Sequence, residues 1–257
     1  MKDRKMLLNE PSYQSQANLR ARADLNEYWH DSPGEPIAKL HSFPKYVCRE
    51  DITKFVARNE LFKRQLQVHG SIIDLGVARG ASLFTWLHLS SIYEPVNYTR
   101  KVIGFDTFEG IPQLHSADLG KHSSEDVRLG GFAVEPQMAK DIARAAEIHD
   151  LTRYLSHISK LELVEGDAEL TLPQYVEEHP HLVVSMLNVD TDVYGPAKKA
   201  LEVLRPRMPK GAVIIFDELA SPLFPGETVA IQEVLGLDNC RIQRFDFAPA
   251  LSYVVVD

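Results

Sequence analysis

The segment SIIDLGVARGAS, residues 71–82, decides the fold of this chain. Its first five residues form a short, mostly apolar run that ends at a glycine, which is typical of a buried strand in a parallel sheet. Gly76 and Gly80 then bound a short turn, and the residues after it have helical spacing. Glycines let a ligand approach the backbone, and the first turn of a helix offers unpaired N–H groups. The segment therefore predicts a strand, a ligand-binding turn and a helix, the alternative being a tight turn without a ligand.

Strand-like and helix-like segments alternate along the rest of the chain. Strand-like runs cover residues 101–105, 161–164, 182–189 and 212–216, and helical spacing covers residues 52–68, 82–89, 134–149, 172–178, 195–204 and 227–235. Such alternation predicts an α/β fold in which helices cover both faces of a mostly parallel sheet. Residues 241–247 and 251–256 flank Pro249 like the arms of a hairpin, so we expect an antiparallel strand at the carboxyl end.

Two polar segments depart from this pattern. Residues 1–50 contain four prolines that interrupt long helices. We expect this N-terminal extension to serve as a lid or an oligomer contact, and the main domain to cover residues 51–257. Residues 113–135 join a strand to a helix through a polar stretch that is long for a compact domain, and such loops are often lids or binding loops.

The composition argues against several classes of protein. The 257 residues include 28 basic and 36 acidic ones, so the net charge of −8 does not favour binding to nucleic acid. Cys48 and Cys240 lie too far apart in sequence for a disulfide framework or a zinc knuckle. Residues 1–8 begin like a secretion signal, but no apolar segment follows, and no run approaches the roughly 20 residues that span a bilayer. We therefore expect a soluble cytoplasmic protein without a membrane partner.

Acidic residues accompany three successive predicted strands. Asp74 lies two positions before Gly76, where a carboxylate would repel a pyrophosphate but attract the ammonium group of an amino acid. Asp106 closes the next strand, the place from which an acid holds the ribose hydroxyls of adenosine cofactors. Asp167 follows the strand after that and could accept a hydrogen bond from an adenine amino group. This order predicts a nucleoside site, although acidic loop residues also fall into such an order by chance.

Carboxylates also gather at the ends of two later strands. Asp190 and Asp192 follow one apolar strand, and Asp217 and Glu218 end the next. Neighbouring parallel strands end side by side, so these carboxylates repel one another unless a proton or a cation bridges them. Oxygen ligands favour Mg²⁺ or Ca²⁺. We therefore expect a metal site here, against the alternative of a solvated acidic rim, and we assign Asp192 to the N-cap of the next helix.

These motifs resemble those of class I S-adenosylmethionine-dependent methyltransferases. More narrowly, the chain is similar to the macrocin O-methyltransferase family, which methylates sugar hydroxyls in natural-product pathways. The matching strings are DLGVARG at 74–80, DTFEGIP at 106–112, VDTDVY at 189–194 and GAVIIFDE at 211–218. The resemblance implies a Rossmann-like, seven-stranded, mostly parallel sheet with an antiparallel C-terminal strand. It also implies a nucleotide-sugar acceptor such as TDP-rhamnose, in antibiotic biosynthesis of the enediyne kind.

The resemblance further implies roles for single residues. Asp74, Gly76 and Gly80 would line the methionine end of S-adenosylmethionine. The full set expected to bind this cofactor is Asp74, Gly76, Val77, Ala78, Arg79, Gly80, Ser82, Asp106, Thr107, Phe108, Gly166, Asp167, Ala168 and Asp190. Mg²⁺ would bind Asp190, Asp217 and Glu218, and Glu218 departs from the family pattern because a second Asp is usual there.

For the transfer itself we expect Mg²⁺ to stabilise the sugar alkoxide as a Lewis acid. Asp190 is the first candidate for the general base, or for a metal ligand on the side of the base, and His115 is the second candidate for the base. A homo-oligomer is expected from the N-terminal extension. The basic residues considered for the acceptor's diphosphate are Lys121, Arg128, Arg20 and Arg22.

Three other functions stay open. A methyltransferase that acts on a catechol or another small hydroxylated metabolite would use a similar acidic site. A nicotinamide-dependent oxidoreductase is disfavoured because the G-x-G-x-x-G pattern is missing and a C-terminal hairpin is predicted. A non-catalytic nucleoside-binding protein would carry these acidic clusters at an electrostatic cost that its function does not need.

Overall fold

The computed structural model describes residues 15–257, and the chain divides into two units, Met1–Val56 and Ala57–Asp257. The first unit holds helices α1 (Gln16–Asp31) and α2 (Pro36–Leu40) and the 3₁₀ turn η2 (Phe43–Lys45). Aromatic rings hold this unit together, since Tyr46 stacks on Tyr28 at 5.4 Å and meets Trp29 edge-on at 5.0 Å. The expectation for residues 1–8 lies outside the described residues, and the role of residues 1–50 as lid or oligomer contact stays a prediction.

The second unit is built on a seven-stranded sheet with the order β3-β2-β1-β4-β5-β7-β6. The strands are β1 (Ser71–Leu75), β2 (Val102–Asp106), β3 (Leu161–Glu165), β4 (Val184–Val189), β5 (Val213–Phe216), β6 (Gln243–Phe245) and β7 (Ala248–Val255). The first five are parallel, whereas β7 is antiparallel to both of its neighbours. The predicted α/β fold is thus confirmed. Chain order reverses between β1 and β4, and ligands of open α/β sheets bind at such a reversal.

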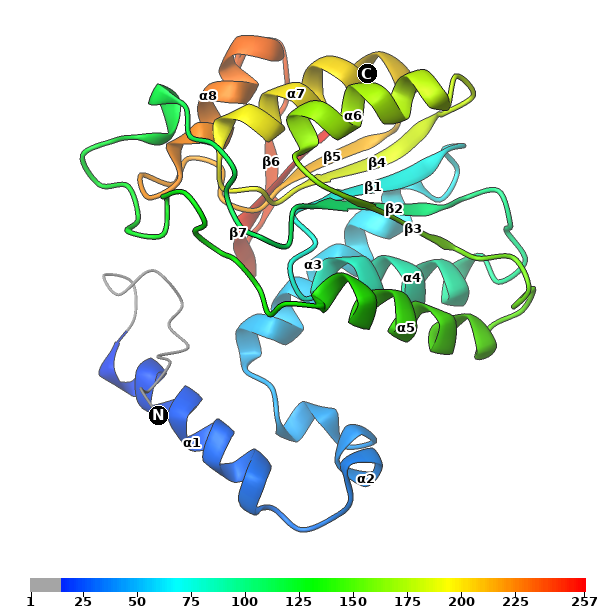
Figure 1. The fold of residues 1–257 in the computed structure, drawn as a ribbon, viewed down its shortest axis with the longest axis vertical. Helices are drawn as coiled ribbons and strands as arrows, with labels where there is room; N and C mark the ends of the chain where they lie inside the picture. Colours follow the sequence, from blue (N-terminus) through cyan, green and yellow to red (C-terminus); the bar gives the residue numbers. More distant parts are fainter. Residues whose placement is uncertain (1–14) are drawn as a thin grey trace. The chain divides into compact units, whose positions relative to one another are not determined.

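Helices cover both faces of this sheet (Figure 1). Helices α6 (Ala168–Glu178), α7 (Tyr194–Leu204) and α8 (Pro225–Val234) lie on one face, and α3 (Arg49–Gln65), α4 (Ala81–Tyr93) and α5 (Met138–Leu151) on the other. Alternate side chains of β1 enter two different hydrophobic cores. Ile73 and Leu75 belong to the core that includes side chains of α6, α7 and α8, and Ile72 belongs to the core that includes side chains of α3, α4 and α5. Burial on both faces explains why the central strands are continuous apolar runs.

The predicted long loop is also present. Between β2 and α5 the chain forms only one short regular element, the 3₁₀ turn η3 (Ser116–Asp118), and a second such turn, η4 (Arg205–Arg207), follows α7. Within residues 15–257, no helix has the length and apolar character needed to cross a membrane.

Candidate functional site

The carboxyl ends of the five parallel strands form one continuous edge. Backbone hydrogen bonds join neighbouring ends in the order Gly166 N to Asp106 O (2.9 Å), Gly76 N to Phe105 O (3.1 Å), Asp190 N to Leu75 O (3.1 Å) and Asp217 N to Val189 O (3.3 Å). The acids singled out in the sequence therefore come from adjacent strand ends. This edge is the candidate site.

Gly76 and Gly80 bound the turn between β1 and α4, with left-handed φ angles of +81° and +86°. A Cβ added to Gly76 would lie 1.7 Å from the carbonyl oxygen of Asp190, so the turn passes directly against the end of β4. Gly80 is the N-cap of α4 and has no side chain with which to cap it. The N–H groups of the first turn are thereby left as donors for a ligand.

Asp74 is fully buried beneath this turn. Its Oδ1 accepts hydrogen bonds from Trp86 Nε1 (3.1 Å) and Asn188 Nδ2 (2.8 Å), and its Oδ2 accepts one from Ser82 Oγ (2.8 Å). Burial raises the pKa of Asp74 above its ordinary value, while these donors favour the ionised form. The side chains of Asp74 and Ser82 thus bind each other and join β1 to α4, and direct contact with a ligand stays a prediction.

Asp106 and Asp167 hold backbone groups at the next two strand ends. Asp106 accepts hydrogen bonds from Ala78 N (2.8 Å) and Phe108 N (2.7 Å) through different oxygens. Asp167 caps α6 by accepting one from Glu169 N at 2.9 Å. Both carboxylates are partly exposed, and a carboxylate oxygen can accept a second hydrogen bond. Both can therefore still receive a ligand's hydroxyl or amino group.

Arg79 ties the turn to the end of the long loop. Its guanidinium donates to both carboxylate oxygens of Glu135, at 2.9 Å each. The pair is exposed, so its contribution to stability is on the order of 1 kcal/mol or less. Its place, between the turn and the start of α5, puts it at the rim of the candidate site.

Asp190 faces a buried cation. The carboxylate lies 3.8 Å from the guanidinium of Arg58 on α3, and the side chains of Asp190 and Arg58 are 25% and 7% exposed. Asp190 is thus reachable from outside, while its neighbour is not.

Two further buried carboxylates fix the chain that follows Asp190. Glu227 on α8 accepts hydrogen bonds from Thr191 N (3.0 Å) and Asp192 N (3.1 Å) through one oxygen. Asp118, in η3, accepts one from Tyr194 N at 2.6 Å and another from His115 N at 2.8 Å. Burial raises the pKa of Glu227 well above its ordinary value, and the charges of Asp192, Asp190 and Asp217 raise it further. The charges of the acids at these strand ends therefore act on Glu227.

The assignment of Asp192 to the N-cap of α7 is wrong. Val193 holds that position, and its side chain makes no capping hydrogen bond. Asp192 has a left-handed φ of +61°, whereas an N-cap residue has an extended backbone. A carboxylate distant in sequence, that of Asp118, takes the N–H of Tyr194 instead.

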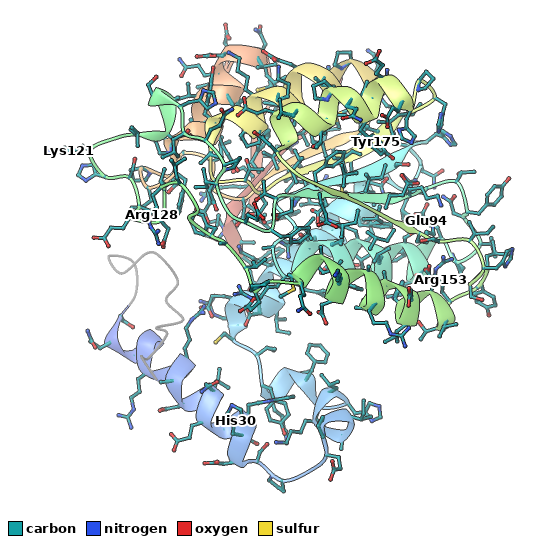
Figure 2. The ribbon with its side chains drawn as sticks, viewed as in Figure 1. His30, Glu94, Lys121, Arg128, Arg153 and Tyr175 are labelled. Atoms are coloured by element: carbon teal, nitrogen blue, oxygen red, sulfur yellow. The ribbon has the colours of Figure 1, made fainter. Side chains whose placement is uncertain are left out.

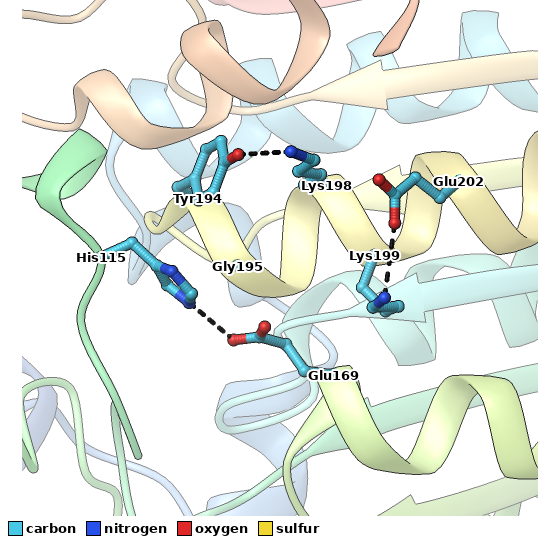
Figure 3. Close-up of a pocket in the computed structure, with 7 residues that line it drawn as sticks. All are labelled: His115, Glu169, Tyr194, Gly195, Lys198, Lys199 and Glu202. Carbon is cyan, nitrogen blue, oxygen red and sulfur yellow. Dashed lines mark hydrogen bonds and ion pairs between the residues drawn. The ribbon is translucent and has the colours of Figure 1, made fainter. Parts of the chain in front are cut away.

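His115 lies in a polar pocket of about 320 Å³ beside the start of α7 (Figure 3). Its Nε2 is 3.1 Å from Glu169 Oε1, and its ring is 5.3 Å from that of Tyr194. The residues that line the pocket are His115, Glu169, Tyr194, Gly195, Lys198, Lys199 and Glu202. His115 is thus the member of the predicted site set that takes part in this pocket.

Lys121 and Arg128, considered for a diphosphate, are exposed on the long loop between β2 and α5 (Figure 2). Arg128 Nη2 lies 3.9 Å from an oxygen of Asp126, a loose pair that leaves the guanidinium open to solvent. Both side chains are accessible to an anionic ligand.

A family described as macrocin-O-methyltransferase (TylF) matches residues 56–233. The chain belongs to this family. Its members are O-methyltransferases that use S-adenosylmethionine, so this protein is an S-adenosylmethionine-dependent O-methyltransferase.

Solved structures agree with this membership. A crystal structure of CalS11, described as a calicheamicin methyltransferase, is 31% identical with a TM-score of 0.89, over 95% of this chain and 94% of that one. An apo structure of CalS11, described as a TDP-rhamnose 3'-O-methyltransferase of calicheamicin biosynthesis, is 30% identical with a TM-score of 0.80, covering 95% and 96%. The O-methyltransferase NovP, at 19% identity, 80% coverage of each chain and a TM-score of 0.59, shares the fold. No curated protein matches the sequence.

The residues predicted to bind Mg²⁺ are Asp190, Asp217 and Glu218. Among residues 15–257, no group of three His, Cys, Asp or Glu side chains is arranged to hold a metal ion. Asp190, the first predicted ligand, pairs with Arg58 instead. The Mg²⁺ site therefore stays a prediction from the sequence, and we derive no step of the reaction through the ion.

Sequence reasoning missed Arg58, Asp118 and Glu227. In the helical pattern of residues 52–68, Arg58 shares a face with Leu61, Phe62 and Gln65, and this polar residue on an apolar face was the available signal. The contact of Asp118 with Tyr194 and that of Glu227 with Asp192 gave no such signal, because these partners lie 76 and 35 residues away in the chain.

Proposed function

We propose that this methyltransferase transfers the methyl group of S-adenosylmethionine to a hydroxyl of a nucleotide-activated deoxysugar, such as TDP-rhamnose, in natural-product biosynthesis. The observation that carries the proposal is the 31% identity to CalS11 over 95% of this chain. CalS11 is described as a TDP-rhamnose 3'-O-methyltransferase. The similarity extends across both units of the chain.

The donor would lie along the ends of β1, β2 and β3. The turn 76–80 would receive its amino-acid part, Asp106 its ribose and Asp167 its adenine. Three features support this arrangement: the uncapped start of α4, the partly exposed carboxylates of Asp106 and Asp167, and their order along one edge. The remaining members of the set predicted from the sequence lie in the segments that directly follow these three strands, except Asp74, which lies in β1, and Asp190, which follows β4.

Asp190 would act as the general base. Methyl transfer from a sulfonium is an in-line displacement in which the acceptor oxygen forms a bond to the methyl carbon as the carbon–sulfur bond breaks. The oxygen then loses its proton, and Asp190 would accept it. Its partial exposure and the contact of its backbone with Gly76 support this role. Such a base contributes typically 10²- to 10⁴-fold to the rate.

His115 is the second candidate for the base. Its Nε2 already shares a hydrogen bond with Glu169, which would orient the ring as carboxylates orient catalytic histidines. Its backbone is held by Asp118, which also holds the N–H of Tyr194. The carboxylate of Asp118 therefore connects the segment of His115 to the start of α7, which follows Asp190 in the chain.

The acceptor class can be tested with a methyl-labelled donor. The protein is incubated with TDP-sugars, with catechols and with no acceptor, and labelled products are separated by chromatography. We expect label on a TDP-sugar. Label on catechols alone would show that the acceptor is a catechol and not a sugar. Label on none of the acceptors would contradict the proposal.

Asp190→Asn tests the base. We expect turnover to fall about 10²- to 10⁴-fold, while the affinity for S-adenosylhomocysteine changes little. Asp246→Asn, an exposed acid in the turn between β6 and β7, is the charge-matched control and should keep full activity. If Asp190→Asn keeps full activity and His115→Gln does not, the base is His115.

The Mg²⁺ requirement, at Asp190, Asp217 and Glu218, stays a prediction from the sequence. Thorough chelation followed by readdition of Mg²⁺ tests it, and unchanged rates after chelation would remove the ion from the reaction. Self-association through residues 1–50 is likewise a proposal. Analytical ultracentrifugation of the full chain, compared with a variant that lacks residues 1–50, tests it.

A further inference from the structure

Arg58 is a buried cation without the hydrogen bonds that buried cations need. The residue is 6% exposed, and its Nε is shielded from solvent without a hydrogen-bond partner in the part of the chain that the structure describes. A guanidinium carries five N–H donors. Among residues 15–257, the ion pair found for its guanidinium is the one with Asp190, and at 3.8 Å it is too long for a hydrogen bond. Leaving such a group unsatisfied is expensive, so the site calls for an acceptor.

Arg100 shows how this same chain satisfies a structural buried arginine. Arg100 is 3% exposed, close to the value for Arg58. Its guanidinium donates to Gln65 Oε1 (2.6 Å) and to the carbonyl oxygens of Gly70 (2.7 Å) and Val68 (2.9 Å), and it pairs with Glu94. Burial alone therefore does not explain why Arg58 has no such partners.

The position of Arg58 is at the candidate site. Helix α3 lies on the same face of the sheet as α4 (Figure 1), and its residues Ala57 and Leu61 belong to one apolar cluster with Val77 of the turn. The guanidinium lies 3.8 Å from the carboxylate of Asp190 at the end of β4, and its charge lowers the pKa of Asp74 in β1, which burial raises. The oxygens of Asp74 already accept three hydrogen bonds from other side chains, so Asp74 is not the missing partner.

We propose that Arg58 binds the carboxylate of the amino-acid part of S-adenosylmethionine. This inference rests on the proposed function and extends it to a residue that the sequence did not indicate. Planar carboxylates match the fork of donors that a guanidinium offers.

The charges around Arg58 select this ligand over the acceptor's diphosphate. Asp190 lies 3.8 Å from the guanidinium, whose charge also acts on Asp74, and both acids would repel a diphosphate, which carries negative charge alone. An amino acid is a zwitterion: its carboxylate would meet Arg58 and its ammonium the negative field of the neighbouring acids. Cations that are open to a diphosphate lie elsewhere, on the exposed loop at Lys121 and Arg128.

A binding cycle tests the assignment. Dissociation constants are measured by calorimetry for S-adenosylhomocysteine and for its decarboxylated analogue, which lacks only the carboxylate. They are measured with the wild type, Arg58→Met, Arg58→Lys and the control Arg64→Met. Arg64 lies on the same helix, where its guanidinium contacts the rings of Phe245 and Tyr253 at 5.9 and 5.1 Å.

We expect the wild type to prefer S-adenosylhomocysteine over the analogue by about 10- to 100-fold, because a hydrogen-bonded charge pair contributes that much. Arg58→Met should lose this preference by weakening only the carboxylate-bearing ligand, Arg58→Lys should keep part of it, and Arg64→Met should keep all of it.

Three results would overturn the inference. One is a wild type that binds both ligands equally, a measurement that needs no variant to fold. The second is an equal loss for both ligands in Arg58→Met, which indicates a structural role. The third is that Arg58→Met binds TDP, added alone, more weakly than the wild type does, while its binding of S-adenosylhomocysteine is unchanged. A wild type that binds neither adenosyl ligand contradicts the proposed function instead.

Discussion

Replacing Gly76 with alanine should separate the turn from the end of β4. Gly76 has a φ of +81°, and the new Cβ would lie 1.7 Å from the carbonyl oxygen of Asp190. Ordinary contact begins at 3.4 Å, so one of the two segments must withdraw by about 1.7 Å. That movement strains the hydrogen bonds Gly76 N to Phe105 O and Asp190 N to Leu75 O, both 3.1 Å long.

The cost can be compared with that at Gly130. Its φ is +70°, and an added Cβ would have no atom within 4 Å. The loss of unfolding free energy in Gly130→Ala therefore comes from the strain of a left-handed backbone, without a steric clash. That strain is about 1–2 kcal/mol. Two buried hydrogen bonds left unmade cost about 1–3 kcal/mol each. We therefore expect Gly76→Ala to lose on the order of 3–8 kcal/mol of unfolding free energy, or not to fold.

Denaturant unfolding of both variants, followed by titration with S-adenosylhomocysteine, makes the comparison. Gly130→Ala should fold and bind the ligand as the wild type does, and Gly76→Ala should bind it much more weakly. Equal stability and equal affinity for the two variants would refute the reasoning, since the turn and the end of β4 would then not be in contact.

Two further predictions concern buried polar groups. Burial lowers the pKa of His149 to about 4, so the unfolded chain, with an ordinary His pKa of 6.5, binds a proton more readily than the folded one. The stability that depends on neutral His149 is fully present above pH 6.5 and is lost as the pH falls to 4. The difference between the two pKa values corresponds to about 3 kcal/mol of unfolding free energy. Urea unfolding at pH 6.5 and pH 4 should show this loss in the wild type and not in His149→Gln. Asp118→Ala leaves the N–H groups of His115 and Tyr194 without their acceptor and should cost about 2–5 kcal/mol, with faster proteolysis of residues 113–135, whereas Glu125→Ala should change neither. The first statement would be contradicted if His149→Gln and the wild type lost the same unfolding free energy between the two pH values. The second would be contradicted if residues 113–135 of Asp118→Ala were cleaved no faster than those of the wild type.

The sheet could be predicted because its information is local. Buried parallel strands are apolar runs, and each ends in a glycine or an acid, so residues 71–76 and 101–105 were recognisable without a structure. The hairpin at the carboxyl end was also recognisable, but the expectation that its strands flank Pro249 is wrong: the turn lies at residues 246–247, and Pro249 belongs to β7. The insertion of β7 between β5 and β6 could not be read, because the pairing of strands depends on contacts distant in sequence.

The site could be predicted only as far as the strand ends. The order of Asp74, Asp106 and Asp167 along one edge follows from strand order, but the partners of these carboxylates do not. The buried groups at this edge bind one another across long separations, as Asp74 does with Asn188. The N-cap of α7 failed for the same reason, because a distant carboxylate replaced the local one.

The central claim is that the ends of β1, β2 and β3 bind an adenosyl amino acid. Equilibrium dialysis of the full chain against radiolabelled S-adenosylhomocysteine tests it most directly. We predict saturable binding of one molecule per chain, and weaker binding when Asp106 is changed to Ala. If the label distributes equally on both sides of the membrane at every concentration up to millimolar, the claim is contradicted.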